Sequence, residues 1–159
     1  MTISFFVPGL PAPGGSKKGF IVPGTRHVNI VDDCSRNKDW RATVSMVAFQ
    51  HIKEPLRCPV RVEVRFYLPR PKGHYRTGKN AGVLKRGAPV YHTIRPDVTK
   101  LWRSTEDSLR MIAWCDDAQI WLQRISKGYV EESTPEAEAS LGRPAYGSPG
   151  AWITIRPEE

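Results

Sequence analysis

Residues 60–68 carry the pattern that most restricts the fold. Apolar side chains occupy every second position from Val60 to Leu68, and charged side chains such as those of Arg61 and Glu63 lie between them. Because successive side chains of a strand point to opposite faces, the alternation predicts a strand with one buried face and one polar face. The apolar face of a sheet built on this strand must be covered by helices or by a second sheet.

Two other segments have the spacing of amphipathic helices. In residues 35–52, Trp40 and further apolar residues recur three or four positions apart, and residues 98–111 repeat the pattern with Leu101 and Leu109 in the apolar stripe. Both patterns match the 3.6-residue period of an α-helix. We therefore predict two helices, each with its apolar face turned toward the sheet.

The remaining regular elements are predicted to be strands. They are residues 3–7, a hairpin of residues 20–22 and 28–31, residues 118–129 and residues 151–155. Strands and helices in this order predict an α/β (α+β) fold with a small mixed sheet and two helices packed on one face. A chain of 159 residues normally forms one domain, so residues 1–159 are expected to form a single unit.

The positive charge of the chain is concentrated in one segment. The formal net charge is +8, and residues 70–103 hold nine Lys or Arg residues against one acid, Asp97. Such a distribution favours a polyanion as partner, nucleic acid first and an anionic membrane surface second. Residues 69–96 are predicted to be a basic loop that contacts DNA, with a merely solvated loop as the alternative. The candidate DNA-contacting residues are Arg70, Lys72, Arg76, Lys79, Lys85, Arg86 and Lys100.

Other features argue against several classes of protein. The three cysteines, Cys34, Cys58 and Cys115, form no CxxC pair, which supports neither a disulfide framework nor a cysteine-based zinc site. No apolar run approaches the roughly 20 residues that span a bilayer, and the N-terminus lacks the pattern of a secretory leader. We expect a cytoplasmic protein without membrane contact, in which residues 131–150 form an acidic linker.

Four aspartates surround the second predicted helix. Asp97 precedes it, Asp107 lies within it, and Asp116 and Asp117 follow it. Carboxylates gathered in a basic surface need a cation, and Mg²⁺ binds one or two protein carboxylates together with water and phosphate oxygens. This arrangement predicts a metal-dependent nuclease.

The spacing of the aspartates does not establish this site. About 14 helical residues, or roughly 20 Å of helix axis, separate Asp97 from Asp117. The two carboxylates can share an ion only if the following strand runs back along the helix or a second copy of the chain closes the gap. The structural alternative makes Asp97 a helix cap and Asp116-Asp117 a turn.

Three motifs lie in and around the second helix: Arg95-Pro96-Asp97-x-x-Lys100-Leu101-x-Arg103, Asp107-x-Leu109 and Asp116-Asp117-Ala118-Gln119-Ile120. Together they resemble the RusA family of Holliday-junction resolvases, which are crossover-junction endodeoxyribonucleases of bacteria, prophages and phages. The opening Val7-Pro8-Gly9-Leu10-Pro11 and the segment of residues 70–80 are similar to phage-type members as well. The resemblance covers most of the chain up to about Lys127.

The resemblance assigns roles to individual residues. It implies that Asp97 and Asp117 are catalytic aspartates and that Arg103 occupies the position of the family's catalytic lysine, where it would neutralise phosphate charge. It also implies Mg²⁺ as cofactor, with Mn²⁺ as a substitute, a homodimer, and branched DNA such as a four-way junction as substrate. The implied metal ligands are Asp97, Asp117 and its acidic neighbour Asp116, and the position of Asp107 on the same helix makes it a fourth candidate ligand.

One position departs from the family pattern. Thr99 stands where the motif has its second aspartate, so the site loses a carboxylate. Asp107, about 12 Å further along the helix axis, or Asp116 would have to compensate for it. The competing hypothesis is a protein that binds junctions or other DNA but cleaves them weakly.

Two further hypotheses have less support. A nuclease of the PD-(D/E)xK kind would need an acid two residues before Lys127, where the chain has Ile125. An RNA-binding protein without nuclease activity would account for the charge but would give the aspartates no purpose.

Overall fold

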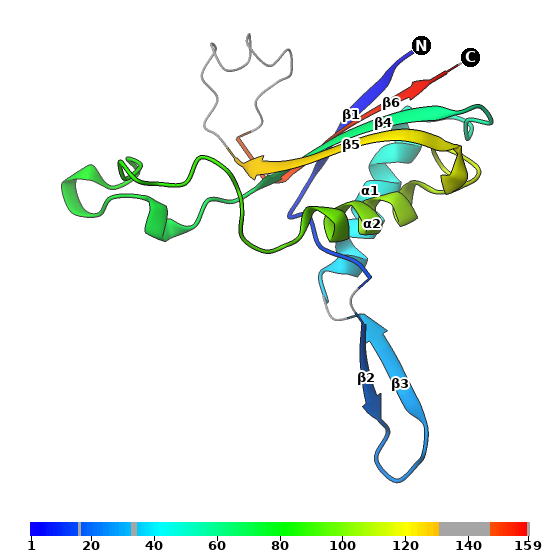
Figure 1. Ribbon diagram of the computed structural model, residues 1–159, viewed down its shortest axis with the longest axis horizontal. Helices are drawn as coiled ribbons and strands as arrows, with labels where there is room; N and C mark the ends of the chain where they lie inside the picture. The colour runs from blue at the N-terminus through cyan, green and yellow to red at the C-terminus, as the bar shows by residue number, and fades with distance from the viewer. Residues whose placement is uncertain (16, 33–34, 131–146, 159) are drawn as a thin grey trace.

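A computed structural model describes residues 1–15, 17–32, 35–130 and 147–158 (Figure 1). Its main element is a four-stranded sheet with the order β1-β6-β4-β5, in which β4 and β5 are parallel and the other neighbours are antiparallel. The strands are β1 (Ile3–Pro8), β4 (Val60–Leu68), β5 (Ile120–Tyr129) and β6 (Gly150–Pro157). The predicted mixed sheet is confirmed.

The central strand β4 follows its predicted alternation closely. Val60, Val62, Val64 and Phe66 are buried, whereas the residues between them are only partly covered. At its end the alternation stops, and Tyr67 is buried too. In the sheet, β4 lies between β5 and β6. Its apolar face packs into the hydrophobic core.

Two helices, α1 (Asn37–His51) and α2 (Val98–Leu109), pack on the same side of the sheet (Figure 1). Their apolar stripes enter the core, as Trp40 of α1 and Leu101 of α2 show by their burial. Polar contacts also join them, because the indole Nε1 of Trp40 donates a hydrogen bond to the hydroxyl of Thr105 at 3.1 Å. The prediction of two helices on one face is therefore confirmed.

The connection from β4 to β5 carries the residues of the predicted site. Parallel neighbours need a long crossover, and this one contains the basic loop, α2 and the short 3-10 turn η3 (Asp117–Gln119). At the far end of β5 the ammonium Nζ of Lys127 bonds the carbonyl oxygen of Pro96, just before α2. The strand therefore runs back along the helix, which is one of the two routes that the spacing of the aspartates left open.

Several element boundaries differ from the prediction by a few residues, and two of them lie at the end of α2 and just after it. α2 ends at Leu109 rather than at Met111, and Met111 has a φ of 65°, which no helix can continue. β5 begins at Ile120 rather than at Ala118, because Asp116 starts the turn η3 with a capping box. Both differences arise from local backbone geometry that hydrophobic periodicity does not report.

Residues 69–96, which we call the basic arm, are more ordered than the predicted loop. The arm contains two 3-10 turns, η1 (Lys72–His74) and η2 (Gly78–Asn80), and its two sides are joined by a bridge between Tyr75 and Leu84. Figure 1 shows it as an extension beyond the end of the sheet. Its closure depends on backbone hydrogen bonds such as the one from the amide of Arg76 to the carbonyl oxygen of Val83, at 2.8 Å.

The predicted hairpin is also confirmed. β2 (Lys17–Ile21) and β3 (Val28–Asp32) form a separate two-stranded sheet that projects away from the core (Figure 1). Ile21, Val28 and Ile30 are among its exposed apolar residues.

Two expectations concern other parts of the chain. Most of the predicted acidic linker, residues 131–146, lies outside the described residues, and Gly150 already belongs to β6. No helix within the described ranges has the length and apolarity needed to cross a bilayer.

Candidate active site

Asp97 lies at the N-terminal end of α2, where the backbone changes from extended to helical. It occupies the N-cap position, but its carboxylate makes no side-chain cap hydrogen bond. The side chain is exposed and forms an ion pair with Lys100, with 3.6 Å between Oδ2 and Nζ. The capping role that the structural alternative offered is therefore not performed by this carboxylate, which remains accessible.

Lys127, on β5, fixes the backbone just before Asp97. Its ammonium donates hydrogen bonds to the carbonyl oxygens of Ile94 at 2.6 Å and Pro96 at 2.7 Å. Burial lowers the pKa of Lys127, and the nearby negative charge of Asp97 opposes this shift. In the sequence, Lys127 enters only the weak PD-(D/E)xK hypothesis; its contact with the Pro96-Asp97 turn requires the tertiary structure.

A second group of carboxylates lies at the other end of α2. Glu106 is partly buried, and burial is the main cause that raises its pKa, followed by the charges of Asp117 and then Asp107. A hydrogen bond from Trp102 and the charge of Arg103 act in the opposite direction. Glu106 and Asp117 are therefore close enough to repel each other.

Glu106 is a functional candidate that the sequence analysis missed. With Thr99, Arg103 and Arg110 it follows the spacing i, i+4, i+7 and i+11, which places all four on one helical face. Asp107, which the sequence predicts to be a metal ligand, lies one position further along the helix, and its side chain is exposed. The helical spacing could have identified Glu106 as a candidate, but the sequence does not show that Glu106 lies near Asp117.

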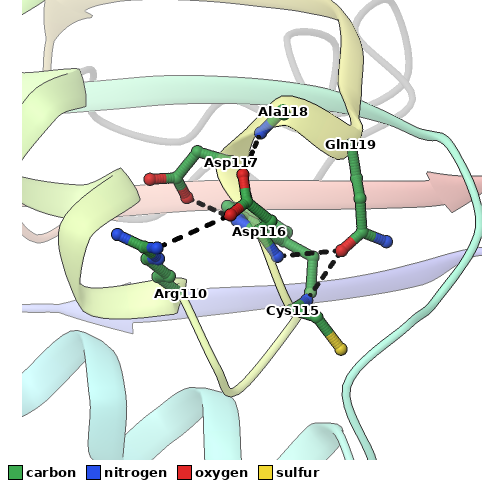
Figure 2. A network of polar contacts seen from close by, with 7 residues as sticks. Arg110, Cys115, Asp116, Asp117, Ala118 and Gln119 are labelled. Atoms are coloured by element: carbon green, nitrogen blue, oxygen red, sulfur yellow. Dashed lines mark hydrogen bonds and ion pairs between the residues drawn. The ribbon is translucent and has the colours of Figure 1, made fainter.

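The turn after α2 holds Asp117 in place (Figure 2). The indole Nε1 of Trp114, whose side chain is 0% exposed, donates a hydrogen bond to Oδ1 of Asp117 at 2.8 Å. This leaves the other carboxylate oxygen, Oδ2, for further contacts. A buried indole is a rigid anchor, so the position of Asp117 is set by the core.

Asp116 has a different environment from Asp117. Its Oδ1 accepts a hydrogen bond from the amide of Ala118 at 2.9 Å, and its Oδ2 lies 3.6 Å from the guanidinium of Arg110 (Figure 2). Gln119 completes the turn by accepting from the amides of Cys115 and Asp116. The predicted turn is therefore present, and the carboxylate of Asp116 is engaged in building it.

Arg103 lies between the two ends of α2. Its side chain is exposed and passes over Gly15, where a Cβ would come within 2.8 Å of Cδ of Arg103. Gly15 has a φ of 82°, a conformation that favours glycine, and it leaves room for the side chain of Arg103. The N-terminal loop thus orients the cation that the sequence predicts to meet phosphate.

The four predicted metal ligands do not form one cluster within a single chain. Asp97 lies at the start of α2, and Asp117 lies beside Glu106, about 12 Å further along the helix axis at 1.5 Å per residue. Among the described residues, no group of three or more His, Cys, Asp or Glu side chains is close enough to hold a metal ion. The rigid helix keeps Asp97 and Asp117 apart even though β5 runs back beside it.

The pair formed by Glu106 and Asp117 has the chemistry that a divalent ion requires. Both side chains offer oxygen ligands, and burial, followed by the charge of Asp117, raises the pKa of Glu106. Mg²⁺ is commonly bound by one or two carboxylates, with water and substrate phosphates as the remaining ligands. The residues present therefore fit a divalent ion that is completed by DNA.

The predicted DNA-contacting residues divide into two groups. The guanidinium of Arg70 donates a hydrogen bond to the carbonyl oxygen of Pro89 at 2.6 Å and lies 4.0 Å from the ring centre of Tyr129. It therefore ties the arm to β5, while Lys100 pairs with Asp97. The other five are exposed on the arm: Lys72, Arg76, Lys79, Lys85 and Arg86.

The fold and the site together define a class of protein: a small α+β protein that presents carboxylates and a cation on one crossover helix, next to an extended basic arm, as nucleases do. The family model described as "Endodeoxyribonuclease RusA" matches residues 23–140. The chain belongs to this family of endodeoxyribonucleases, as the motifs around α2 predicted.

One relative has been identified among curated proteins. It is the "Uncharacterized protein YqaN" of Bacillus subtilis (strain 168), which is 31% identical over 135 residues. The match covers 84% of this chain and 92% of the relative. The similarity therefore extends over nearly the whole of both proteins, although the name of the relative specifies no activity.

Proposed function

We propose that the protein is a Mg²⁺-dependent, structure-selective endonuclease that resolves Holliday junctions and related branched DNA by paired, symmetric cuts. The observation that carries this proposal is the carboxylate pair of Glu106 and Asp117 beside Arg103 in a chain of the RusA family. This activity belongs to recombination or repair and would take place in the cytoplasm of a bacterial or phage-infected cell.

In this proposal Asp117 and Glu106 hold the divalent ion, and Glu106 replaces the carboxylate that the motif loses at Thr99. Bound there, Mg²⁺, or Mn²⁺ in its place, would neutralise charge on the phosphate and lower the pKa of a water molecule. Asp107 and Asp116 are proposed as secondary contributors to the negative potential. Asp116 contributes least, since its carboxylate is engaged with Ala118 and Arg110.

Arg103 is proposed to contact the phosphate that is cut. A guanidinium stays protonated, so it can neutralise the charge that accumulates in the transition state but cannot donate a proton. The side chain is exposed and passes beside Gly15 of the N-terminal loop, so it is accessible to a phosphate. Arg103 therefore acts as a fixed charge clamp.

A homodimer would supply two sites related by a two-fold axis, which matches the approximate symmetry of a four-way junction. Because about 12 Å of helix separates Asp97 from Asp117 within one chain, we propose that Asp97 completes the site of the other copy. Lys127 holds the turn before Asp97 in the required position. The exposed cations of the basic arm would bind the phosphates of the junction arms.

The test is Mg²⁺-dependent nicking of a synthetic four-way junction, with a linear duplex of the same sequence as control. We expect wild-type protein to nick the junction symmetrically, and Asp97→Asn and Asp117→Asn to reduce the rate by about 100-fold or more. Failure of wild-type protein to nick any branched DNA with Mg²⁺ or Mn²⁺ would contradict the proposal.

The same assay tests the alternative, a junction-binding protein with weakened catalysis. Thr99, which is exposed in the first turn of α2 and brings no charge, favours this alternative. It predicts that wild-type protein binds the junction without cutting it and that Thr99→Asp restores cleavage. Under our proposal, wild-type protein already nicks the junction, and Thr99→Asp changes only the rate of nicking.

A further inference from the structure

A pocket of about 540 Å³ opens at the N-terminal end of α2, where the N-terminal loop, the end of β4 and the turn before α2 meet. We call it the α2 pocket. The residues that matter for its chemistry are Leu10, Leu68, Ile94, Arg95, Asp97 and Lys100. Its volume lies in the range of sites that bind small organic ligands.

The walls of the α2 pocket combine two kinds of surface. Leu10, Leu68 and Ile94 supply apolar area, together with prolines of the N-terminal loop. Arg36, Arg95 and Lys100 also line it, against one acid, Asp97. A ligand that matches these walls has a flat apolar part and an anionic part, which is the chemistry of a nucleotide.

The pocket has fixed walls. Hydrogen bonds hold these walls together. The ammonium of Lys127 donates to the carbonyl oxygens of Ile94 and Pro96, and the amide of Gly14 donates to the carbonyl oxygen of Lys100 at 2.9 Å. His92, which also lines the pocket, is only 6% exposed, and its Nδ1 has no hydrogen-bond partner among the residues that the structure describes. The pocket therefore does not depend on a mobile loop to form.

The start of α2 adds an anion site at the rim. A helix begins with amide groups that have no partner within the helix, and its N-terminus carries a partial positive charge. In most helices a side chain caps these amides, but the carboxylate of Asp97 makes no such bond. A phosphate at this rim would meet the amides together with Arg95 and Lys100.

We propose that the α2 pocket binds a nucleotide that is unstacked from the branch point, with its base or sugar against the apolar walls and its phosphate at the rim. This inference rests on the proposed function and extends it. Inside a duplex every base is stacked, and removing one costs free energy, whereas a base at a crossover has already lost part of its stacking. Binding in this pocket would thus select branched over linear DNA.

The experiment uses four-way junctions in which 2-aminopurine replaces one base at each crossover position in turn, with the full-length protein and without divalent metal. The fluorescence of 2-aminopurine rises when the base leaves the stack. Ile94→Trp fills the pocket, and Val90→Trp, at a 73% exposed position of the same segment that does not line the pocket, is the matched control. Leu10→Trp is a second variant that fills the pocket from another wall.

We expect fluorescence to rise severalfold at one crossover position with wild type and with Val90→Trp, and to stay at the free-junction level with both pocket-filling variants. In the presence of Mg²⁺, the pocket-filling variants should also cut the junction about 10- to 100-fold more slowly, because the scissile phosphate is misplaced. Thermal melts followed by circular dichroism show whether each variant is folded.

Two outcomes would overturn the inference: no fluorescence change with wild type at any crossover position, or equal changes with Ile94→Trp and Val90→Trp. If wild type still nicks the junction in either case, the inference fails and the proposed function stands. If wild type neither nicks nor prefers branched DNA, the proposed function fails with it.

Discussion

Glu106 and Asp117 bring two negative charges near each other at the end of α2. Burial and the charge of Asp117 raise the pKa of Glu106. The folded protein therefore binds a proton on the carboxylate of Glu106 more tightly than the unfolded chain does. Perturbed pKa values cluster at functional sites, so the shift makes Glu106 a candidate functional residue.

Because the pKa of Glu106 is raised, we predict that Glu106→Gln increases the stability of the protein by an amount that depends on pH. Below the ordinary pKa of a glutamate both states are protonated, and the variant should melt like wild type. As pH rises through the raised folded-state pKa, wild type loses stability and the neutral variant does not. We expect the variant to melt about 1–3 °C higher at pH 7. Melting curves at several pH values measure this.

The control for this prediction is Asp107→Asn, one position away and exposed. It should change the melting temperature less. Added Mg²⁺ should stabilise wild type more than Glu106→Gln, since only wild type keeps both ligands of the proposed pair. An equal response of the two proteins to Mg²⁺ would show that Glu106 holds no metal.

Lys127 supplies the second prediction at the residue scale. Lys127→Met leaves the carbonyl oxygens of Ile94 and Pro96 without their donor, which should lower the free energy of unfolding by about 1–3 kcal/mol. Because the turn before Asp97 loosens, nicking should fall by more than the loss of folded protein explains. Denaturant unfolding and the nicking rate of the same samples measure both effects.

Lys127→Arg is the conservative partner of this variant, since it keeps the charge and can donate to both carbonyl oxygens. It should recover part of the nicking rate and of the stability. If Lys127→Met is destabilised but nicks at the wild-type rate per folded molecule, Lys127 has only a structural role.

At the scale of elements, the basic arm is a folded extension with a fixed base. His74 and His92 pack on the ring of Tyr129, with ring centres 5.5 and 4.8 Å from it, and Arg70 lies over the same ring. The cations further out, such as Lys79 and Arg86, are exposed. Cations on the same arm therefore have two different environments: Arg70 anchors the arm, and the exposed cations are the ones proposed to bind DNA.

This division predicts different effects for Lys79→Ala and Arg70→Ala. Lys79→Ala should weaken junction binding and reduce the slope of log K against log salt by about 0.9, as expected for one lost phosphate contact. Arg70→Ala should instead make the arm more sensitive to limited proteolysis, because the arm loses its attachment to Tyr129 and Pro89. Salt titrations and protease digestion of both variants distinguish them. Equal protease resistance of the two variants would contradict the anchoring role of Arg70.

At the scale of the whole molecule, the crossover between β4 and β5 determines which groups can act together. α2 is a rigid rod with Asp97 at one end and Glu106 and Asp117 near the other. Among the residues that the structure describes, no group of three or more His, Cys, Asp or Glu side chains brings these ends to one ion. The proposed homodimer resolves this if each site takes Asp97 from one copy and Asp117 from the other.

Mixing two inactive variants tests this arrangement. If the site is shared, a mixed dimer of Asp97→Asn and Asp117→Asn has one site with both changes and one site with neither, and it should regain nicking of one strand. If each site lies within one chain, every site in the mixed dimer carries a change and nicking stays absent. The measurement is nicking by the mixed and refolded variants, compared with each variant alone.

The hydrophobic pattern was sufficient to predict the sheet, the two helices and the hairpin, because burial of apolar side chains imposes periods of 2 and 3.6 residues that can be read directly. The motifs around α2 were sufficient to predict the family. The C-terminal end of α2 and the start of β5 differ from the prediction by a few residues, since Met111 and the capping box of Asp116 act through local geometry that leaves no periodic trace.

The sequence by itself determined which residue types are available: the acids around α2, the cation at Arg103, the basic arm and the apolar faces that build the core. Only the tertiary structure decided their neighbours. It placed the half-buried Glu106 near Asp117, brought Lys127 to the turn before Asp97, and set Arg70 over the ring of Tyr129. The reason is physical: contacts between residues far apart in the chain depend on how a rigid helix lies against a twisted sheet, and spacing along the chain carries no record of that distance.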